Sequence, residues 1–189
     1  MRRQSMNRII TGQVLLVLCC MVYLIWWYRG FRPGINVSRV GGVNGLLLLI
    51  TAGLGIAGIV LSLAPVPPVS KMKADPMMIA LGGIIAYFVL LLVTKVCFQR
   101  VVTTELILIV GWAVLEIVVI TRLDAAGLLG RNGFFVLCLV VAVAVVISMI
   151  LYVAYYRMEE MKAFYAAMVP LVTEGLAMII LIAMVAMNR

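Results

Sequence analysis

Residues 168–187 read MVPLVTEGLAMIILIAMVAM, a run of twenty residues whose single charged side chain is Glu174. A helix of about 20 residues is roughly 30 Å long, which matches the hydrocarbon core of a bilayer. Of the chain's 189 residues, 66% are hydrophobic and 12% are charged, whereas a soluble domain is about 45–50% apolar and about 25% charged. Five similar stretches precede this one, at 9–28, 43–63, 77–97, 105–121 and 134–156. The sequence therefore predicts an all-α integral membrane protein, a compact bundle of six transmembrane helices forming one domain over residues 1–189.

The connectors between these stretches are short, and most contain residues that usually end helices. Pro33 and Gly34 interrupt the first connector, while Pro76 and Pro170 lie where a helix could begin and where a missing N–H is tolerated. The last connector, YYRMEEMKAFYAAM at 155–168, instead consists of good helix formers. It predicts continuous helix, with a separate interfacial helix as the alternative.

The chain is basic, with a formal net charge of +8 from 15 Lys and Arg against 7 Asp and Glu. These basic residues stand singly between apolar runs, which indicates contact with anionic headgroups of the lipid bilayer rather than with nucleic acid. With six spans, the side carrying both termini has eight Lys and Arg and the other side has seven. Arg2, Arg3 and Arg8 close to the first span favour a multi-pass protein of the cell membrane with a cytoplasmic N-terminus. Insertion in both orientations is the alternative.

A weak internal similarity relates the two halves of the chain. A shift of 92 residues places Gln13 over Glu105, and it also aligns Arg39 with Arg131, Gly41 with Gly133 and Gly83 with Gly175. Three spans in each half would make the halves inverted relative to each other, as in many secondary transporters. Two inverted three-helix halves are thus one possible arrangement of the bundle.

Two glutamates lie well inside the predicted spans. An acid at mid-bilayer costs about 2.5–3.5 kcal/mol and normally faces the bundle interior or water. Glu105 and Glu116 are eleven residues apart, close to three helical turns, so they should form one inward stripe with Trp112. Glu174 should differ from Glu116 in depth by roughly 7 Å, from the helical rise of about 1.5 Å per residue. The pattern predicts a solute or ion pathway lined by these residues.

A purely structural interpretation of the same acids is also open. Glu174 follows Pro170 by four residues, so it could lie near a helix N-terminus, where the helix dipole favours an acid. Glu116 could form a buried ion pair with Lys95 or Arg122. In either case the acids would stabilise the bundle and not line a pathway.

Three arginines share the first connector. Arg29, Arg32 and Arg39 are interspersed with glycines in YRGFRPGINVSRVGG. Together they could hold an anion or a lipid headgroup, and the alternative is ordinary interfacial charge around a turn.

The second span, at 43–63, is rich in glycine. Gly41 and Gly45 form a Gly-x-x-x-Gly pair, and Gly53 and Gly55 lie in further small-residue pairs. Small residues let membrane helices approach closely, so these four glycines predict a helix–helix contact. The partner helix could belong to the same chain, to another copy in a homo-oligomer, or to a different membrane protein.

Several classes of function are disfavoured by what the chain lacks. It has no histidine, and its four cysteines do not form a C-x-x-C pair. Its thirteen methionines could suit Cu(I), but packing in an apolar core is their ordinary use. We therefore expect no metal, no cofactor and no enzymatic activity.

These observations lead to two functional hypotheses. The first is a protein that binds or passes an unknown small solute or ion through its bundle, coupled to protons or cations by the intramembrane glutamates. The alternative is a non-catalytic membrane subunit or scaffold that packs against another membrane protein through the Gly-rich second span.

Overall fold

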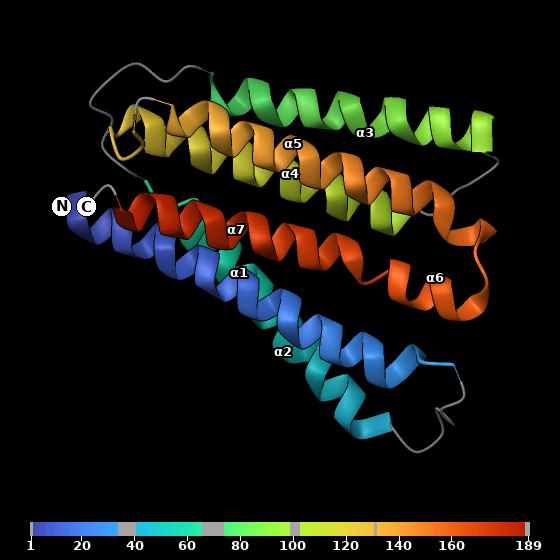
Figure 1. The fold of residues 1–189 in the computed structure, drawn as a ribbon. Coiled ribbons are helices and arrows are strands. Elements are labelled where there is room, and N and C mark those ends of the chain that lie inside the picture. Colours follow the sequence, from blue (N-terminus) through green and yellow to red (C-terminus); the bar gives the residue numbers. More distant parts are fainter. Residues whose placement is uncertain (1, 34–40, 66–73, 99–102, 131, 188–189) are drawn as a thin grey trace.

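Six long apolar helices make up nearly all of the structure. The computed structural model describes residues 2–33, 41–65, 74–98, 103–130 and 132–187. Each of the six is long and apolar enough to cross a membrane, and together they confirm the predicted six-helix bundle of a multi-pass membrane protein. In chain order they are α1 (Arg2–Phe31), α2 (Gly41–Ser62), α3 (Pro76–Phe98), α4 (Thr103–Ala125), α5 (Gly133–Ala154) and α7 (Val169–Met187) (Figure 1).

The prediction of continuous helix over 155–168 is wrong. After the 3-10 turn Tyr155–Arg157, the backbone is extended at Met158 and Glu159, and the short helix α6 (Glu160–Ala166) follows. Packing of α6 against the end of α1 accounts for the break, since Phe164 is buried and Trp27 Nε1 donates a 3.4 Å hydrogen bond to its carbonyl oxygen. This tertiary contact overrides a helical propensity that is only a weak determinant.

The helices form two groups joined by α7. Helices α1 and α2 pack closely along each other, while α3, α4 and α5 form the second group, and α7 packs against both α1 and α5. The two groups lie together where the chain termini meet and diverge toward the end that carries α6 (Figure 1). The bundle is therefore wedge-shaped.

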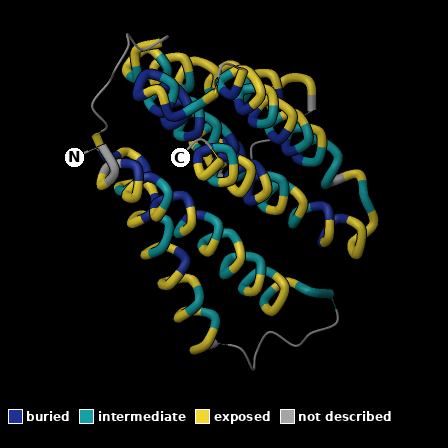
Figure 2. Tube along the Cα trace, turned by 60° about the vertical axis from the view of Figure 1, so that its left-hand side comes forward, coloured by how far each residue is buried: buried dark blue, intermediate teal, exposed yellow. Residues whose placement is uncertain are grey.

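The tightest core lies at the narrow end of the wedge. Buried side chains from α1, α4, α5 and α7 meet there, among them Ile9, Ile120, Leu137 and Leu181. Outward faces are exposed (Figure 2) and carry many large hydrophobic side chains, as expected for helices surrounded by lipid. Helix α3 is the most exposed of the six helices, because only 6% of its most apolar stretch is buried.

Close packing of α1 on α2 depends on two glycines that the sequence pattern did not single out. A Cβ atom added at Gly12 would lie 2.5 Å from the backbone nitrogen of Ser62, and one at Gly58 would lie 2.7 Å from Leu16 Cγ. Among the glycines predicted to pack, Gly55 lies near Cys19 Sγ, at 3.4 Å from an added Cβ, but Gly45 and Gly53 have no described neighbour within 4 Å. Gly41 is the first residue of α2. Within the described chain, Gly45 and Gly53 therefore do not mediate a helix–helix contact.

The two halves of the chain are not packed alike. In the second half, α7 packs along α5. The corresponding helices of the first half, α3 and α2, make no more than marginal contact in the described part of the chain, and α3 packs on α4 instead. Strict inverted symmetry between the halves is therefore not present in this arrangement.

Substitution of Gly12 tests the α1–α2 contact. We expect Gly12→Ala to destabilise the protein by about 1–3 kcal/mol, because the added methyl group overlaps the backbone of α2. Gly53→Ala is the matched control, since the new methyl group meets open space and alanine is the better helix former by about 1 kcal/mol. The measurement is the midpoint of thermal unfolding in detergent micelles, followed by tryptophan fluorescence. Equal midpoints for the two variants would contradict the close contact.

Candidate functional site

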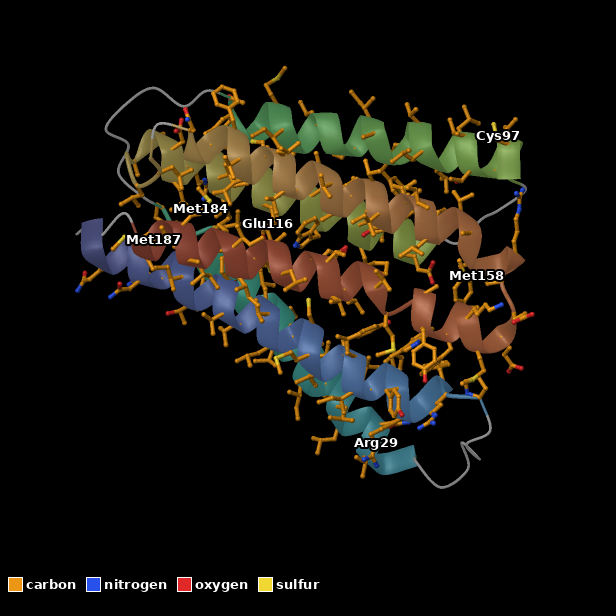
Figure 3. The ribbon with its side chains drawn as sticks, viewed as in Figure 1. Arg29, Cys97, Glu116, Met158, Met184 and Met187 are labelled. Carbon is orange, nitrogen blue, oxygen red and sulfur yellow. The ribbon has the colours of Figure 1, made fainter. Side chains whose placement is uncertain are left out.

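A chain of buried polar side chains links three helices inside the bundle. Gln13 on α1 and Ser62 on α2 are both fully buried, and Gln13 Nε2 donates a 3.3 Å hydrogen bond to Ser62 Oγ. The Gln13 side chain also lies close enough to the carboxyl group of Glu116 on α4 to interact with it as a hydrogen-bond donor. Glu116 is only 1% exposed, and its place in the interior of the bundle is seen in Figure 3. Because lipid offers no alternative partner, these bonds tie α1 to both α2 and α4.

Glu116 and Glu174 lie near each other inside the bundle. Helices α4 and α7 touch, both carboxyl groups are buried, and they are close enough for their charges to interact. Cys20 on α1 lies within electrostatic range of both. The two acids thus occupy one buried region between α1, α4 and α7.

No cation neutralises these two acids among the described residues. The expected alternative partners of Glu116 lie elsewhere, since Lys95 is exposed and Arg122 Nη1 donates a 2.6 Å hydrogen bond to the carbonyl oxygen of Leu63. Within the described residues, an ion pair joins Lys162 Nζ to Glu159 Oε2 at 2.9 Å, and both side chains lie on the exposed surface near the start of α6. A structural ion pair within the described chain therefore does not explain Glu116 or Glu174.

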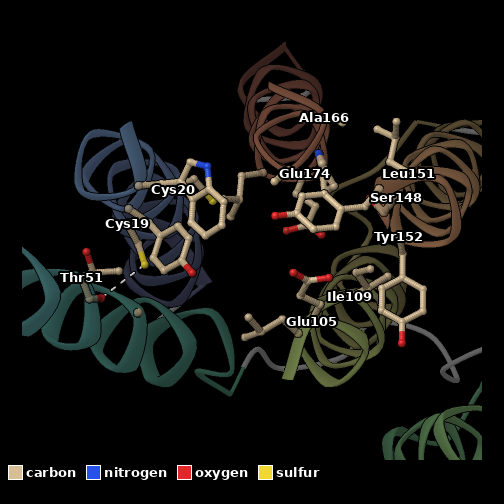
Figure 4. A pocket seen from close by; sticks show the side chains of 18 of the residues that line it. Cys19, Cys20, Thr51, Glu105, Ile109, Ser148, Leu151, Tyr152, Ala166 and Glu174 are labelled. Carbon is tan, nitrogen blue, oxygen red and sulfur yellow. Dashed lines mark hydrogen bonds between the residues drawn. The ribbon is translucent and has the colours of Figure 1, made fainter. Parts of the chain in front are cut away.

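A cavity of about 410 Å³ opens beside Glu174. Its wall is formed by α1, α2, α4, α5 and the chain from Tyr155 to α7. Figure 4 shows Glu105 of α4 and Glu174 of α7 facing the same space, with Cys20 of α1 on one side and Ser148 of α5 on the other. Most of the remaining wall is aliphatic or aromatic. The cavity is thus an apolar space that contains two carboxyl groups.

Several buried polar atoms in this region lack a partner within the described chain. They are Gln13 Oε1, Glu116 Oε1, Ser148 Oγ and Trp112 Nε1. Unpartnered buried polar atoms are uncommon and costly, and they often mark functional sites. Ser148 is fully buried and forms part of the cavity wall, so its unpartnered hydroxyl group lies at the edge of the cavity.

The three residues of the predicted stripe on α4 do not all lie in the same environment. Glu105 lines the cavity with Glu174, whereas Glu116 is not part of the cavity wall. Trp112 is half-buried and packs against the apolar core at the narrow end of the wedge. One helix therefore carries an acid at the cavity and a second acid deeper in the bundle.

The predicted arginine cluster is only partly described. Arg29 is exposed near the end of α1, at the wide end of the wedge (Figure 3). Arg32 donates a hydrogen bond to the Tyr28 hydroxyl group, and its guanidinium lies 5.1 Å from the centre of the Tyr28 ring. Arg39 lies outside the described residues. An anion site formed by all three stays a prediction.

Sequence reasoning missed Gln13, Ser62 and Ser148 as members of the site. Each is a polar residue inside an apolar stretch, which is a usable signal because such residues normally face the interior. The sequence pattern marks Gln13 only as the residue aligned with Glu105, and the two serines are neutral and small. Gln13 and its partner Ser62 lie 49 residues apart in the chain, so local sequence does not identify their contact.

Known proteins do not supply the function of this site. Comparison with protein-family models, with curated proteins and with solved structures yields no match. Function is therefore argued from the cavity and its side chains, since residues and geometry, and not a fold class, carry function.

A double-mutant cycle tests the bond between Gln13 and Glu116. We expect Gln13→Leu and Glu116→Leu to be coupled by about 0.6 kcal/mol, and at most about 1.7 kcal/mol, as for other hydrogen bonds between membrane helices. The free energies come from equilibrium unfolding by sodium dodecyl sulfate in mixed micelles. Gln4→Leu is the control, because Gln4 is exposed on the same helix and should show no coupling to Glu116. Equal coupling in both cycles would refute the bond.

Proposed function

We propose that this membrane protein binds a small solute in the cavity beside Glu174 and moves it through the bundle, with Glu174 and Glu116 exchanging protons or cations during that movement. The observation that carries the proposal is a cavity of about 410 Å³ inside the bundle with Glu174 in its wall and no described cation beside that acid. Cavities of about 300–1,000 Å³ are typical of small-molecule sites. Intramembrane acids in transporters commonly serve as proton relays.

The surroundings of the two acids support a role in proton exchange. The groups within electrostatic range of Glu174 are Glu116 on α4 and Cys20 on α1, while Glu105 and Tyr155 share the cavity wall. Two carboxyl groups this close in an apolar interior do not readily ionise together. Gln13 Oε1 and Glu116 Oε1 are hydrogen-bond acceptors without a donor in the described chain. A proton on Glu116 would convert one of its carboxyl oxygens into a donor.

The division of the acids suggests a sequence for the exchange. Glu174 faces the cavity and would meet the solute, whereas Glu116 lies behind it and is held by Gln13. A proton displaced from Glu174 by the solute would then have Glu116 as a carboxyl acceptor within electrostatic range. The fixed hydrogen bond from Gln13 would hold that acceptor in place.

A second candidate function is supported by a different surface. Gly45 and Gly53 on α2 meet no described atom within 4 Å, although small residues of this kind commonly mediate contacts between membrane helices. A non-catalytic subunit or scaffold that binds another membrane protein through this face of α2 would use them. Such a protein should lose its partner on Gly53→Leu and tolerate Glu174→Gln. A solute carrier should show the opposite pattern.

Carbodiimide labelling tests the proposed role of the acids. Dicyclohexylcarbodiimide reacts with a protonated carboxyl group that it can reach from the membrane. We expect Glu174 in liposomes to be labelled at pH 7 and faster than Glu116, because Glu174 faces the cavity, and labelling should fall as rising pH removes the proton. Glu159 is the control, since its side chain is 78% exposed and lies outside the apolar interior of the bundle. Site-resolved mass spectrometry measures each glutamate separately.

Absence of labelling at both Glu116 and Glu174 across pH 5–9 would sink the proposal. It would mean that the two carboxyl groups are ionised or unreachable. Labelling of Glu116 ahead of Glu174 would contradict the proposed order of the two acids.

A further inference from the structure

The described residues of the cavity wall include acidic side chains but no basic ones. Its two titratable carboxyl groups are Glu105 and Glu174, and no lysine or arginine is among the described residues that form it. Among the described residues of the wall, an anion would meet two carboxyl groups and no cationic side chain to offset its lost hydration. A cation can gain a charge-assisted bond from either acid. The wall therefore selects for positive charge.

The rest of the wall suits a large apolar body. Tyr23, Trp27 and Tyr155 line it with aromatic rings, of which that of Trp27 is also stacked on Phe31, and aliphatic side chains such as Ile59 and Leu171 form further parts of the wall. Aromatic faces attract organic cations, and the attraction grows when the cation is desolvated. A hard inorganic ion is served poorly here, because it needs about six or more oxygen ligands around it. The wall combines a negative end with apolar and aromatic sides.

The cavity is open sideways to the lipid between α2 and α4. Ile56 on α2 and Leu108 on α4 both line it, yet they are 66% and 62% exposed. The two helices make no more than marginal contact in the described chain, where the bundle diverges (Figure 1). A ligand that dissolves in the bilayer can thus enter without passing through water.

An independent observation marks this space as a binding site. Ser148 Oγ has no hydrogen-bond partner within the described chain although Ser148 is fully buried and lines the cavity. It is neutral and lies on α5, apart from the acids on α4 and α7 (Figure 4). A ligand with a polar group beside its charge would satisfy it.

We infer that the ligand of this cavity is a lipophilic organic cation that enters from the bilayer between α2 and α4 and is held by Glu105, Glu174 and the ring of Trp27. The inference rests on the proposed function and names its substrate class. The cation's charge lies between the two carboxyl groups, its apolar body lies against the aromatic side chains, and its arrival displaces a proton from Glu174.

Two ions of equal shape and opposite charge test this selectivity. Tetraphenylphosphonium and tetraphenylborate are both lipophilic, and binding of each to the full-length protein in nanodiscs is measured by equilibrium dialysis. Empty nanodiscs give the partition into lipid alone. We expect saturable binding of the phosphonium cation, with a dissociation constant at least about tenfold lower than that of the borate anion. A tenfold difference in dissociation constant is the size of effect expected from a single charge-assisted contact.

Matched variants connect this selectivity to the named side chains. Combined Glu105→Gln and Glu174→Gln should abolish the preference for the cation, while combined Glu159→Gln and Glu160→Gln on exposed α6 remove the same charge and should leave it unchanged. Trp27→Leu should weaken cation binding by about tenfold through the lost ring. Trp26→Leu is its control, because Trp26 does not line the cavity. The cation-to-anion ratio is insensitive to a partial loss of folded protein.

The outcomes separate the ligand class from the proton role. Cation-selective binding that depends on Glu105 and Glu174 supports the inference, and slower carbodiimide labelling of Glu174 in the presence of the phosphonium supports it further. Equal binding of both ions, unaffected by the glutamate variants, overturns it and indicates a cleft filled by lipid. No saturable binding while Glu174 is still labelled at pH 7 overturns the ligand class and leaves the proposed function standing. Selective binding without any labelling supports the site and overturns the proton role.

Discussion

Lipid cannot form hydrogen bonds, and this constraint governs both the fold and the site. It places nearly all of the backbone in helices, since every N–H and C=O in the hydrocarbon core must be satisfied within the chain. It also explains why Gln13 on α1 bonds to Ser62 on α2 and to Glu116 on α4. The same constraint makes exceptions informative. The unpartnered oxygen of Ser148 lies beside the cavity, where a bound molecule, and not lipid, would supply the missing partner.

The architecture was predictable because hydropathy records this constraint directly. All six spans lie where the apolar stretches are, and even the short stretch 105–121 belongs to a full helix that continues to Ala125. The packing was not predictable to the same degree. A glycine promotes close approach only when it faces a neighbouring helix, so the glycine-rich pattern of α2 indicated Gly53, whereas the contact uses Gly58 and Gly12. Likewise, the break before α6 depends on Phe164 meeting α1, which no local pattern encodes.

The site was predictable only in its charged members. Helical rise places Glu116 and Glu174 at similar depth, and adjacent helices α4 and α7 make them neighbours. Helical rise does not determine which acid faces the cavity, because that depends on the separation between α2 and α4. It also gives no reason to choose Gln13, whose role arises from partners on two other helices. Long-range polar contacts are therefore the part of this site that required a structure.

The position of α7 relates the cavity to the shape of the whole bundle. It packs on α1 and on α5, so it joins the two diverging groups of helices (Figure 1), and it also carries Glu174, which lines the cavity. A ligand changes the balance between two arrangements of the helices only by as much as its affinity for the two arrangements differs. A ligand between Glu174 and the aromatic rings of α1 touches both sides of the wedge at once. Its contacts would therefore depend on the separation of the two groups, and under the proposed function that separation would be the coordinate along which a solute passes the buried acids.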